Sequence, residues 1–263
     1  MFGGVDMLIE DISPFVFTIG GFGVRWYGLL VAISMLIGLI VLIKHGTRQG
    51  LEEDVLYGLA IWIILGGIVG ARLVYVLTNL PTFLAFPAEI IRIDHGGLSW
   101  HGAILGGAIP GWLYARKHRL DFNHLADLVV PGLATGYFLV RIANIFNQEV
   151  LGRPALALGF ERHPAQIYGS LIGLTLLIVH NILARKNPPR GVLFWSFVFW
   201  YSILRAVFEE TARANPLYWP VYVNEAYGLG LFTLTHLVTP PILLLSWYML
   251  RRARSKDERT LTS

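Results

Sequence analysis

The sequence predicts an all-α fold: a polytopic membrane protein with about seven transmembrane helices. Of its 263 residues, 55% are hydrophobic and 14% are charged, with a mean hydropathy of +0.58. That is far more apolar than an ordinary globular domain. A helix needs around 20 apolar residues to cross a bilayer core about 30 Å thick, and seven stretches approach that length. No linker is long enough to separate two domains, so we expect a single integral membrane domain over residues 1–263.

The expected transmembrane segments alternate with loops that carry basic residues. The segments lie near residues 25–43, 55–77, 99–115, 124–145, 165–184, 191–210 and 229–250. Thirteen Lys or Arg residues fall on the loops of the C-terminal side: Lys44, Arg48, Arg116, Lys117, Arg119, Arg185, Lys186, Arg190, Arg251, Arg252, Arg254, Lys256 and Arg259. Four fall on the opposite loops: Arg92, Arg153, Arg162 and Arg213. Because cytoplasmic loops are enriched in Lys and Arg, we expect a cytoplasmic C-terminus and an N-terminus outside.

Charge and cysteine usage exclude several classes of function. The formal net charge of +4 follows this topological pattern, so no nucleic-acid partner is expected. The chain has no cysteine, so any thiol in its chemistry belongs to a substrate. Asp6, Glu10 and Asp11 stand near the start in place of a basic cluster, so we expect no cleavable signal peptide.

Two stretches indicate how the segments meet each other and the lipid. The outside connection over residues 78–98 mixes prolines and glycines with apolar residues, which is typical of an amphipathic segment on the outer leaflet. The second segment carries Gly66-Gly67 and Gly70-Ala71, a small-residue face suited to close helix packing.

The least apolar part of the predicted membrane region runs from Val140 to Glu149. At about 100° per residue, Arg141, Asn144 and Gln148 fall on one face if the helix extends that far. An ionisable residue at bilayer depth costs roughly 2.5–3.5 kcal/mol. Arg141 therefore needs a partner, a water-filled cavity or an anionic ligand.

Arg72 and Arg205 also lie within or beside apolar segments, in the outer half by the topology above. Guanidinium groups gathered in a low-dielectric bundle repel one another, so an anion is expected among them. A phospholipid phosphate fits the arginine fork through two parallel hydrogen bonds. The alternative is internal pairing, of Arg205 with Glu209 or of Arg141 with Glu149.

Two further patterns add candidate residues. Tyr201, Arg205 and Glu209 stand at i, i+4 and i+8, one stripe of the sixth segment, where Glu209 is placed to orient Arg205. His101 opens the third segment among glycines, and histidine is the natural proton acceptor near neutral pH. The alternative for His101 is an interfacial or capping residue. None of the eight histidines has a metal-ligand spacing and the sequence contains no Walker loop, so neither a metal nor a nucleotide cofactor is expected.

Five segments, in this order and spacing, resemble the bacterial prolipoprotein diacylglyceryl transferase family. They are Gly70–Val76, Gly97–Gly102, Arg141–Arg153, His163–Tyr168 and Arg205 with Glu209. The resemblance covers most of the chain. It implies a seven-helix enzyme of the bacterial inner membrane, with a periplasmic N-terminus. Such an enzyme transfers the diacylglyceryl group of phosphatidylglycerol to the lipobox cysteine of a prolipoprotein signal peptide.

The resemblance also implies roles for individual residues. His101, Arg141 and Arg205 are expected to be catalytic: the two arginines stabilise the phosphate of the leaving glycerol 1-phosphate, and His101 acts as a general base. The expected substrate-binding residues are Tyr27, Arg72, Asn144, Glu149, Gly152, Tyr201 and Glu209. The chain departs from the usual family pattern at Ala103, Ala143, Gly169 and His236, where glycine, glycine, glutamate and glutamine are usual.

Two other classes of function compete with the transferase. A non-catalytic lipid or anion transporter would use the same arginine cavity but would not require His101. A purely structural scaffold leaves the cost of Arg141 and Arg205 unexplained.

Overall fold

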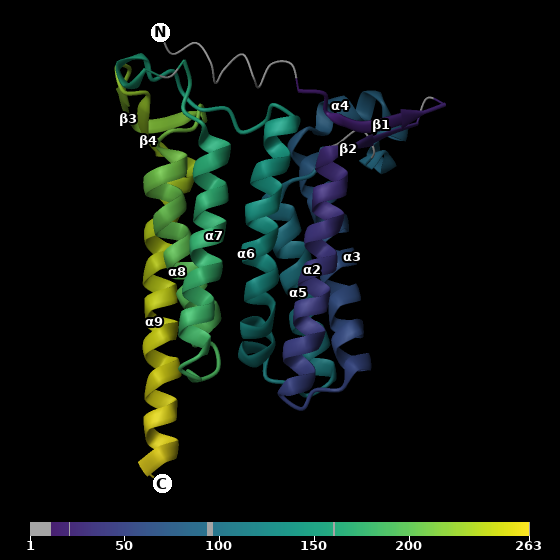
Figure 1. Ribbon diagram of the computed structural model, residues 1–263, viewed down its shortest axis with the longest axis vertical. Helices are drawn as coiled ribbons and strands as arrows, with labels where there is room; N and C mark the ends of the chain where they lie inside the picture. Colours follow the sequence, from purple (N-terminus) through teal and green to yellow (C-terminus); the bar gives the residue numbers. More distant parts are fainter. Residues whose placement is uncertain (1–11, 21, 94–96, 160, 263) are drawn as a thin grey trace. The chain divides into compact units, whose positions relative to one another are not determined.

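The structure, a computed structural model, describes residues 12–20, 22–93, 97–159 and 161–262. At residues 22, 100, 101 and 256–262 it describes the backbone alone. Figure 1 shows a mostly helical chain. Its elements are β1 (Phe15–Ile19), β2 (Phe22–Arg25), α2 (Trp26–Arg48), α3 (Glu53–Thr78), α4 (Leu80–Ala85), η1 (Pro87–Ile91), α5 (Trp100–Lys117), α6 (Phe122–Phe146), η3 (Leu156–Leu158), α7 (Ala165–Ala184), α8 (Val192–Leu204), η4 (Arg205–Glu210), β3 (Leu217–Asn224), β4 (Leu229–Thr233) and α9 (Leu234–Thr262).

The chain divides into two compact units. The first unit comprises Met1–Gly38 and Val129–Ser263, and the second comprises Leu39–Leu128. The boundaries fall inside α2 and α6, so each of these helices contributes to both units. That the whole chain is a single domain stays a prediction.

The second unit is built on the close packing of α3 against α5. A Cβ atom added to Gly66 would lie 2.2 Å from the carbonyl oxygen of Gly106, and one added to Gly70 would lie 2.5 Å from that of Gly102. No larger residue fits at these contacts, because the two backbones approach each other directly. The small-residue face of the second predicted segment is therefore the surface on which α5 packs.

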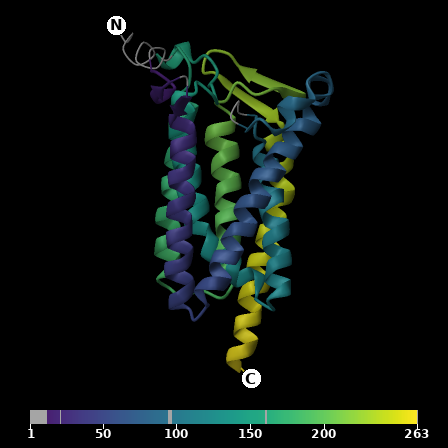
Figure 2. The same ribbon diagram turned by 90° about the vertical axis from the view of Figure 1, so that its right-hand side faces the viewer.

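The first unit has its core between helices. Ala134 and Tyr137 of α6 pack on Ile172 and Leu176 of α7, and partly buried Tyr201 of α8 lies against this cluster. Helix α8 in turn packs against α9, and Figure 1 shows α7, α8 and α9 side by side. The β3–β4 hairpin lies at the end of α9 opposite to the C-terminus (Figure 2).

Two antiparallel hairpins correct the prediction of an all-α fold. Strand β1 pairs with β2, and β3 pairs with β4. The seventh predicted segment, 229–250, therefore begins too early, because Leu229–Thr233 is a strand and the helix starts at Leu234. The sequence of β4, LGLFT, is apolar, and composition does not separate such a short run from the start of a buried helix.

Five helices in the described part of the chain are long and apolar enough to cross a membrane. They are Trp26–Arg48, Glu53–Thr78, Phe122–Phe146, Ala165–Ala184 and Val192–Glu210. These five indicate a multi-pass membrane protein, while the count of seven is not confirmed. Helices α5 and α9 cover the other two predicted segments. Helix α5 contains Pro110 and has Arg116 and Lys117 in its last turn, and α9 contains Pro240 and Pro241.

The connection between α3 and α5 in the second unit contains two short helices, α4 and η1. Leu84, Phe86 and Ile91 point their side chains outward, with Ile91 84% exposed. Such apolar exposure agrees with a segment that meets lipid. Its placement on the outer leaflet stays a prediction.

Candidate active site

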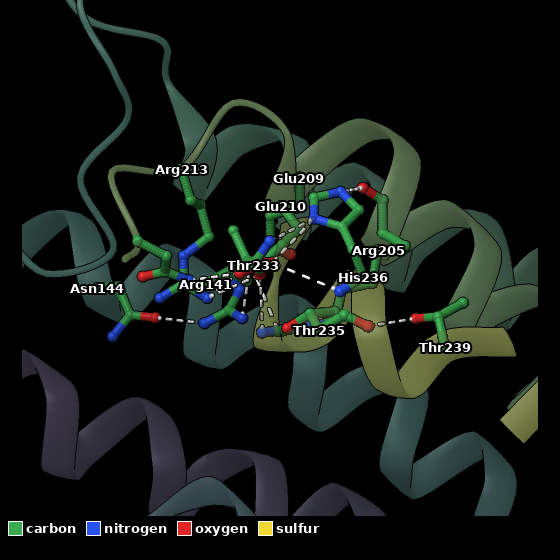
Figure 3. Close-up of polar contacts among 12 residues, drawn as sticks. Arg141, Asn144, Arg205, Glu209, Glu210, Arg213, Thr233, Thr235, His236 and Thr239 are labelled. Carbon is green, nitrogen blue, oxygen red and sulfur yellow. Dashed lines mark hydrogen bonds and ion pairs between the residues drawn. The ribbon is translucent and has the colours of Figure 1, made fainter. Parts of the chain in front are cut away.

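Arg141 and Arg205 meet at one buried carboxylate in the first unit. Arg141 projects from α6, and Arg205 is the first residue of the π-helical segment η4. A guanidinium nitrogen of Arg141 lies 2.8 Å from Oε1 of Glu209, and a guanidinium nitrogen of Arg205 lies 3.6 Å from the same atom. The side chain of Glu209 is 0% exposed, so both ion pairs lie away from water (Figure 3).

The π-helical turn brings a second carboxylate to the same place. Arg205 Nη2 donates to Oε2 of Glu210 at 3.2 Å. In an α-helix, Glu210 would stand about 140° around the axis from Arg205, because each residue adds about 100°. A π-turn contains more residues per turn, since its hydrogen bonds join i and i+5. Glu209 and Glu210 therefore both face Arg205.

Arg213 is a third arginine of this cluster, although its place in the sequence predicts only a charge in a loop. Its Nη1 lies 3.5 Å from Glu209 Oε1 and 3.8 Å from Glu210 Oε2. Burial lowers the pKa of the Arg213 guanidinium, and Arg205 and Arg141 lower it further while the two carboxylates oppose them. An arginine stays protonated in proteins even so. Three guanidinium cations thus face two carboxylates, which leaves one positive charge in excess.

Tyr137 links both predicted catalytic arginines. Its hydroxyl oxygen accepts hydrogen bonds from Arg141 Nη2 at 3.1 Å and from Arg205 Nη1 at 3.3 Å, and its O–H donates to Glu209. The Tyr137 ring also lies under the Arg141 guanidinium, 4.6 Å from its central carbon. Tyr137 was missed from the sequence, although it stands one helical turn before Arg141 on the same face.

Asn144 and Glu149 support Arg141 from the end of α6. Arg141 Nη1 donates to Asn144 Oδ1 at 3.1 Å, and Asn144 Nδ2 donates to Glu149 Oε2 at 3.0 Å. Gln166 of α7 donates to the backbone carbonyl of Glu149 at 2.8 Å. Arg141 therefore pairs with Glu209 and reaches Glu149 only through Asn144, which differs from the direct pair considered above.

Gln148 does not share the helical face of Arg141 and Asn144, because the helix does not extend that far. Helix α6 ends at Phe146, and Gln148 and Val150 have positive φ values of 52° and 62°. This conformation is unfavourable for residues with a Cβ, and most of all for β-branched valine. The two strained residues flank Glu149 and turn the chain away from the helix axis.

The other residues expected from the resemblance lie at varying distances from the cluster. Tyr27 of α2 is half-buried and within electrostatic reach of Glu149 and Arg141. The buried hydroxyl of Tyr201 has no hydrogen-bond partner among the described residues, and its ring packs edge-on against that of Tyr137, with the ring centroids 5.0 Å apart.

Gly152 shapes the loop that follows Glu149. A Cβ atom added to Gly152 would lie 2.1 Å from the carbonyl oxygen of His163, and Gly152 forms an isolated β-bridge with Arg213. A larger residue would displace that bridge. These contacts place Gly152 as a backbone support of Arg213.

Gly169, a departure from the family pattern, is the surface over which Arg141 passes. A Cβ atom at this position of α7 would lie 2.7 Å from Cγ, Cδ and Nε of Arg141. The Nε atoms of Arg141 and Arg213 are buried, and neither has a hydrogen-bond partner in the part of the chain that the structure describes. The absence of a side chain at Gly169 lets the stem of Arg141 lie flat on α7.

Arg72 lies in the second unit, where its partners are backbone carbonyls. Its Nε donates to Ile90 at 2.8 Å, Nη1 to Gly97 at 2.9 Å and Nη2 to Arg92 at 3.1 Å, with a further contact to Glu89. These bonds tie the connection after α3 to the helix end. The binding of substrate by Arg72 stays a prediction.

His101 also belongs to the second unit, in the first turn of α5. Ser99 caps this helix by accepting a hydrogen bond from the Gly102 N–H at 3.4 Å. The side chain of His101 lies outside the described part of the chain, so its role as a base stays a prediction. Within the described residues, no group of three or more His, Asp or Glu side chains is arranged to hold a metal ion.

Comparison with known proteins agrees with the resemblance seen in the sequence. A family model described as prolipoprotein diacylglyceryl transferase matches residues 14–251. The phosphatidylglycerol–prolipoprotein diacylglyceryl transferase of a Thermoanaerobacter species is 49% identical over 247 residues, 94% of this chain and 96% of the relative. Relatives of the same name from Caldanaerobacter subterraneus and Thermus thermophilus are 46% and 38% identical, over 96% and 89% of this chain and 98% and 96% of their own. The chain belongs to the prolipoprotein diacylglyceryl transferase family.

Proposed function

We propose that this chain transfers the diacylglyceryl group of phosphatidylglycerol to the cysteine thiol of a prolipoprotein lipobox. The thiol sulfur attacks the glycerol carbon of the lipid that bears the phosphate. A C–S bond forms, the C–O bond to the phosphate breaks, and glycerol 1-phosphate leaves with the electron pair. The thiol proton goes to a base. No cofactor is required, because the phosphate is already a leaving group.

The observation that carries this proposal is the excess positive charge of the buried cluster. Among the described residues, the carboxylates that face Arg141, Arg205 and Arg213 are those of Glu209 and Glu210. Within the same part of the chain, the buried Nε groups of Arg141 and Arg213 have no hydrogen-bond acceptor. A phosphate that gains charge as its ester bond breaks would be stabilised there, because donors fixed in a low-dielectric site act strongly on developing charge.

The thiol is supplied by the second substrate. The chain contains no cysteine, and a free thiol has a pKa near 8.5, so only a few per cent is thiolate at pH 7. We assign the base role to His101. Loss of such a base should matter less as the pH rises, because the thiol then ionises unaided.

The membrane orientation follows the basic loops. The lipobox of a prolipoprotein is presented at the outer side of the inner membrane, and the tail that carries Arg251 and Arg252 is placed in the cytoplasm. The arginine cluster lies at the start of α9, where His236 bonds the carbonyl of Ala206, so we place it in the outer half.

The deciding experiment is to incubate the purified protein with phosphatidylglycerol and a lipobox peptide. Mass spectrometry should detect a diacylglyceryl thioether on the peptide cysteine, and a Cys→Ser peptide is the matched control. If the protein moves lipid between leaflets and forms no thioether, the transporter hypothesis is correct and the transferase hypothesis is wrong.

The base role has its own test in variants His101→Gln and His101→Ala. Assayed from pH 6 to pH 9.5, both should recover part of the lost activity as the pH approaches and passes the thiol pKa near 8.5. A deficit that stays constant over this range would exclude the base role and leave the arginine cluster untouched.

A further inference from the structure

His236, in the first turn of α9, connects that helix to the π-helical turn of the arginine cluster. Its Nε2 lies 2.9 Å from the backbone carbonyl oxygen of Ala206, the residue after Arg205. Its Nδ1 accepts the backbone N–H of Thr233 at 3.2 Å, and the Thr233 hydroxyl lies 2.9 Å from the same nitrogen. Figure 3 shows the side chain of His236 together with Thr233.

These contacts determine which ring nitrogen carries the proton. The Thr233 N–H is a donor, so Nδ1 is the acceptor and is unprotonated. The proton then resides on Nε2, which donates it to the Ala206 carbonyl. The imidazole of His236 thus accepts a hydrogen bond from Thr233 of β4 and donates one to Ala206 of η4.

The carbonyl of Ala206 belongs to the segment in which the helix is π rather than α. A side chain that hydrogen-bonds into the i→i−4 ladder is a recognised cause of local departures from α-helical geometry. The π-helical geometry of η4 changes the ion pairs of the cluster, because it turns Glu210 as well as Glu209 toward Arg205. An α-helical register would point Glu210 away and leave Arg205 with one carboxylate.

Glu210 is also linked to His236, through Thr233. Glu210 is 1% exposed and accepts a hydrogen bond from Asn215 Nδ2 at 2.6 Å, and Thr233, which is also 1% exposed, hydrogen-bonds to it. Thr233 therefore contacts both His236 and Glu210. A shift of His236 would be transmitted to Arg205 through the helix backbone and through this carboxylate.

We propose that His236 is a positioning residue for the transferase reaction: it fixes the π-helical register that orients Arg205 toward the lipid phosphate. His236 does not touch the reacting atoms in this assignment. The expected effects on kcat and KM rest on the proposed function. The expected effect on the Kd of glycerol 1-phosphate does not.

The test compares His236→Leu, which removes the donor and the acceptor, with His236→Gln, whose amide can supply both. Thr239→Val is the matched control, because Thr239 is a buried residue of the same helix whose hydroxyl donates only to its own helix, to Thr235 at 2.8 Å. Four quantities are measured in detergent: kcat, KM for phosphatidylglycerol, KM for a lipobox peptide, and the Kd of glycerol 1-phosphate. The melting temperature is recorded for each variant.

We expect His236→Leu to lower kcat/KM for phosphatidylglycerol and to weaken glycerol 1-phosphate binding, each by about tenfold. The KM for the peptide should not change. His236→Gln should restore most of both losses, and Thr239→Val should behave as the wild type even if its melting temperature falls as far as that of His236→Leu.

The proposal is overturned if His236→Leu stays within twofold of the wild type in kcat/KM and in the Kd of glycerol 1-phosphate. It is also overturned if the Gln variant is as impaired as the Leu variant, or if the loss merely follows melting temperature across all three variants. A wild-type protein that forms no thioether would refute the proposed function instead, and the glycerol 1-phosphate arm would still decide the role of His236.

Discussion

Arg141 in the first unit and Arg72 in the second are equally buried, at 8% and 9% exposure, yet their partners differ in kind. Arg72 donates to the carbonyls of Ile90, Gly97, Glu89 and Arg92, which are neutral acceptors at fixed places in a loop. Arg141 instead shares a carboxylate with two other cations and keeps a buried Nε without a partner. Burial of an arginine is therefore not enough to indicate an anion site.

The difference lies in the balance of charge and of donors. The guanidinium group of Arg72 donates to backbone carbonyls of the connection after α3, so these bonds join that connection to the helix. The cluster around Glu209 has more cations than anions and more N–H donors than acceptors. A bound phosphate would correct both imbalances at once.

The largest expected effect is the loss of activity in Arg141→Lys or Arg205→Lys. Lysine keeps the positive charge but loses the planar fork that meets Glu209, Tyr137 and a phosphate together. We expect thioether formation to fall by about 100-fold or more, as for the removal of a donor to developing charge, with little change in melting temperature. Near-normal turnover in both variants would mean that the reaction does not require the planar fork of these arginines.

The second effect is a loss of stability in Arg72→Leu. Several carbonyls of the connection after α3 would lose their donor, which we expect to cost on the order of 2 kcal/mol in the free energy of unfolding. Thermal unfolding in detergent should show a lower transition, whereas the glycerol 1-phosphate Kd of the folded protein should change little. If the Kd rises as far as in Arg141→Lys and the transition does not move, Arg72 belongs to the anion site after all.

The third effect concerns Tyr137→Phe, which removes the one hydroxyl shared by Arg141, Arg205 and Glu209. The ring and its contact with Tyr201 remain, so the change isolates the hydroxyl. Since a hydrogen bond to a charged group contributes about 1.5–3 kcal/mol, kcat should fall by about tenfold or more. Tyr201→Phe removes the neighbouring hydroxyl, an expected substrate contact that has no hydrogen-bond partner among the described residues. A Tyr137→Phe variant with the kcat of the wild type would argue that Tyr137 acts through the packing of its ring alone.

Gly169→Ala asks whether the path of Arg141 over α7 matters to its chemistry. The added methyl group would overlap Cγ, Cδ and Nε of Arg141, so the guanidinium must move relative to Glu209. We expect a fewfold to tenfold loss in kcat/KM, because displacements of about 1 Å in a catalytic group have such effects or larger ones. Gly136→Ala on α6 is the matched control, since a Cβ there meets only the Ser34 hydroxyl, at 4.0 Å. If the Gly169 variant turns over as fast as the Gly136 variant, the side chain of Arg141 can shift to accommodate the methyl group without loss of activity.

Much of the helical architecture follows from composition, because long apolar runs have few ways to satisfy their backbone in lipid other than as helices. The predicted segments coincide with helices for that reason, apart from the strand at Leu229–Thr233. Arg141, Arg205 and Glu209 were predictable because ionisable side chains in apolar runs need partners. These three do meet in the structure.

Other parts of the site depend on tertiary structure that no local pattern indicates. The stripe of Tyr201, Arg205 and Glu209 assumes an α-helix, so it predicts Glu209 and excludes Glu210, whereas the π-turn admits both. The sequence around Arg213 predicts only a charged residue in a loop, whereas in the structure Arg213 forms an ion pair with Glu209. Val150, a β-branched residue, gives no sign in the sequence of the positive φ it adopts.

The smallest expected effect is that of Val150→Gly, which tests whether backbone strain differs between the two units. In the described part of the chain, the non-glycine residues with positive φ include Gln148 and Val150 on either side of Glu149, and Arg119 in a turn of the second unit. Such strain costs of order 1–3 kcal/mol, while glycine loses somewhat more backbone entropy on folding. We therefore expect Val150→Gly to stabilise the protein by about 1 kcal/mol. It should also lower kcat/KM by about twofold, because Glu149 then holds Asn144 and Arg141 less firmly. Arg119→Gly should show the gain in melting temperature alone. A Val150 variant that gains stability with full activity would mean that the strain beside Glu149 has no part in positioning Arg141.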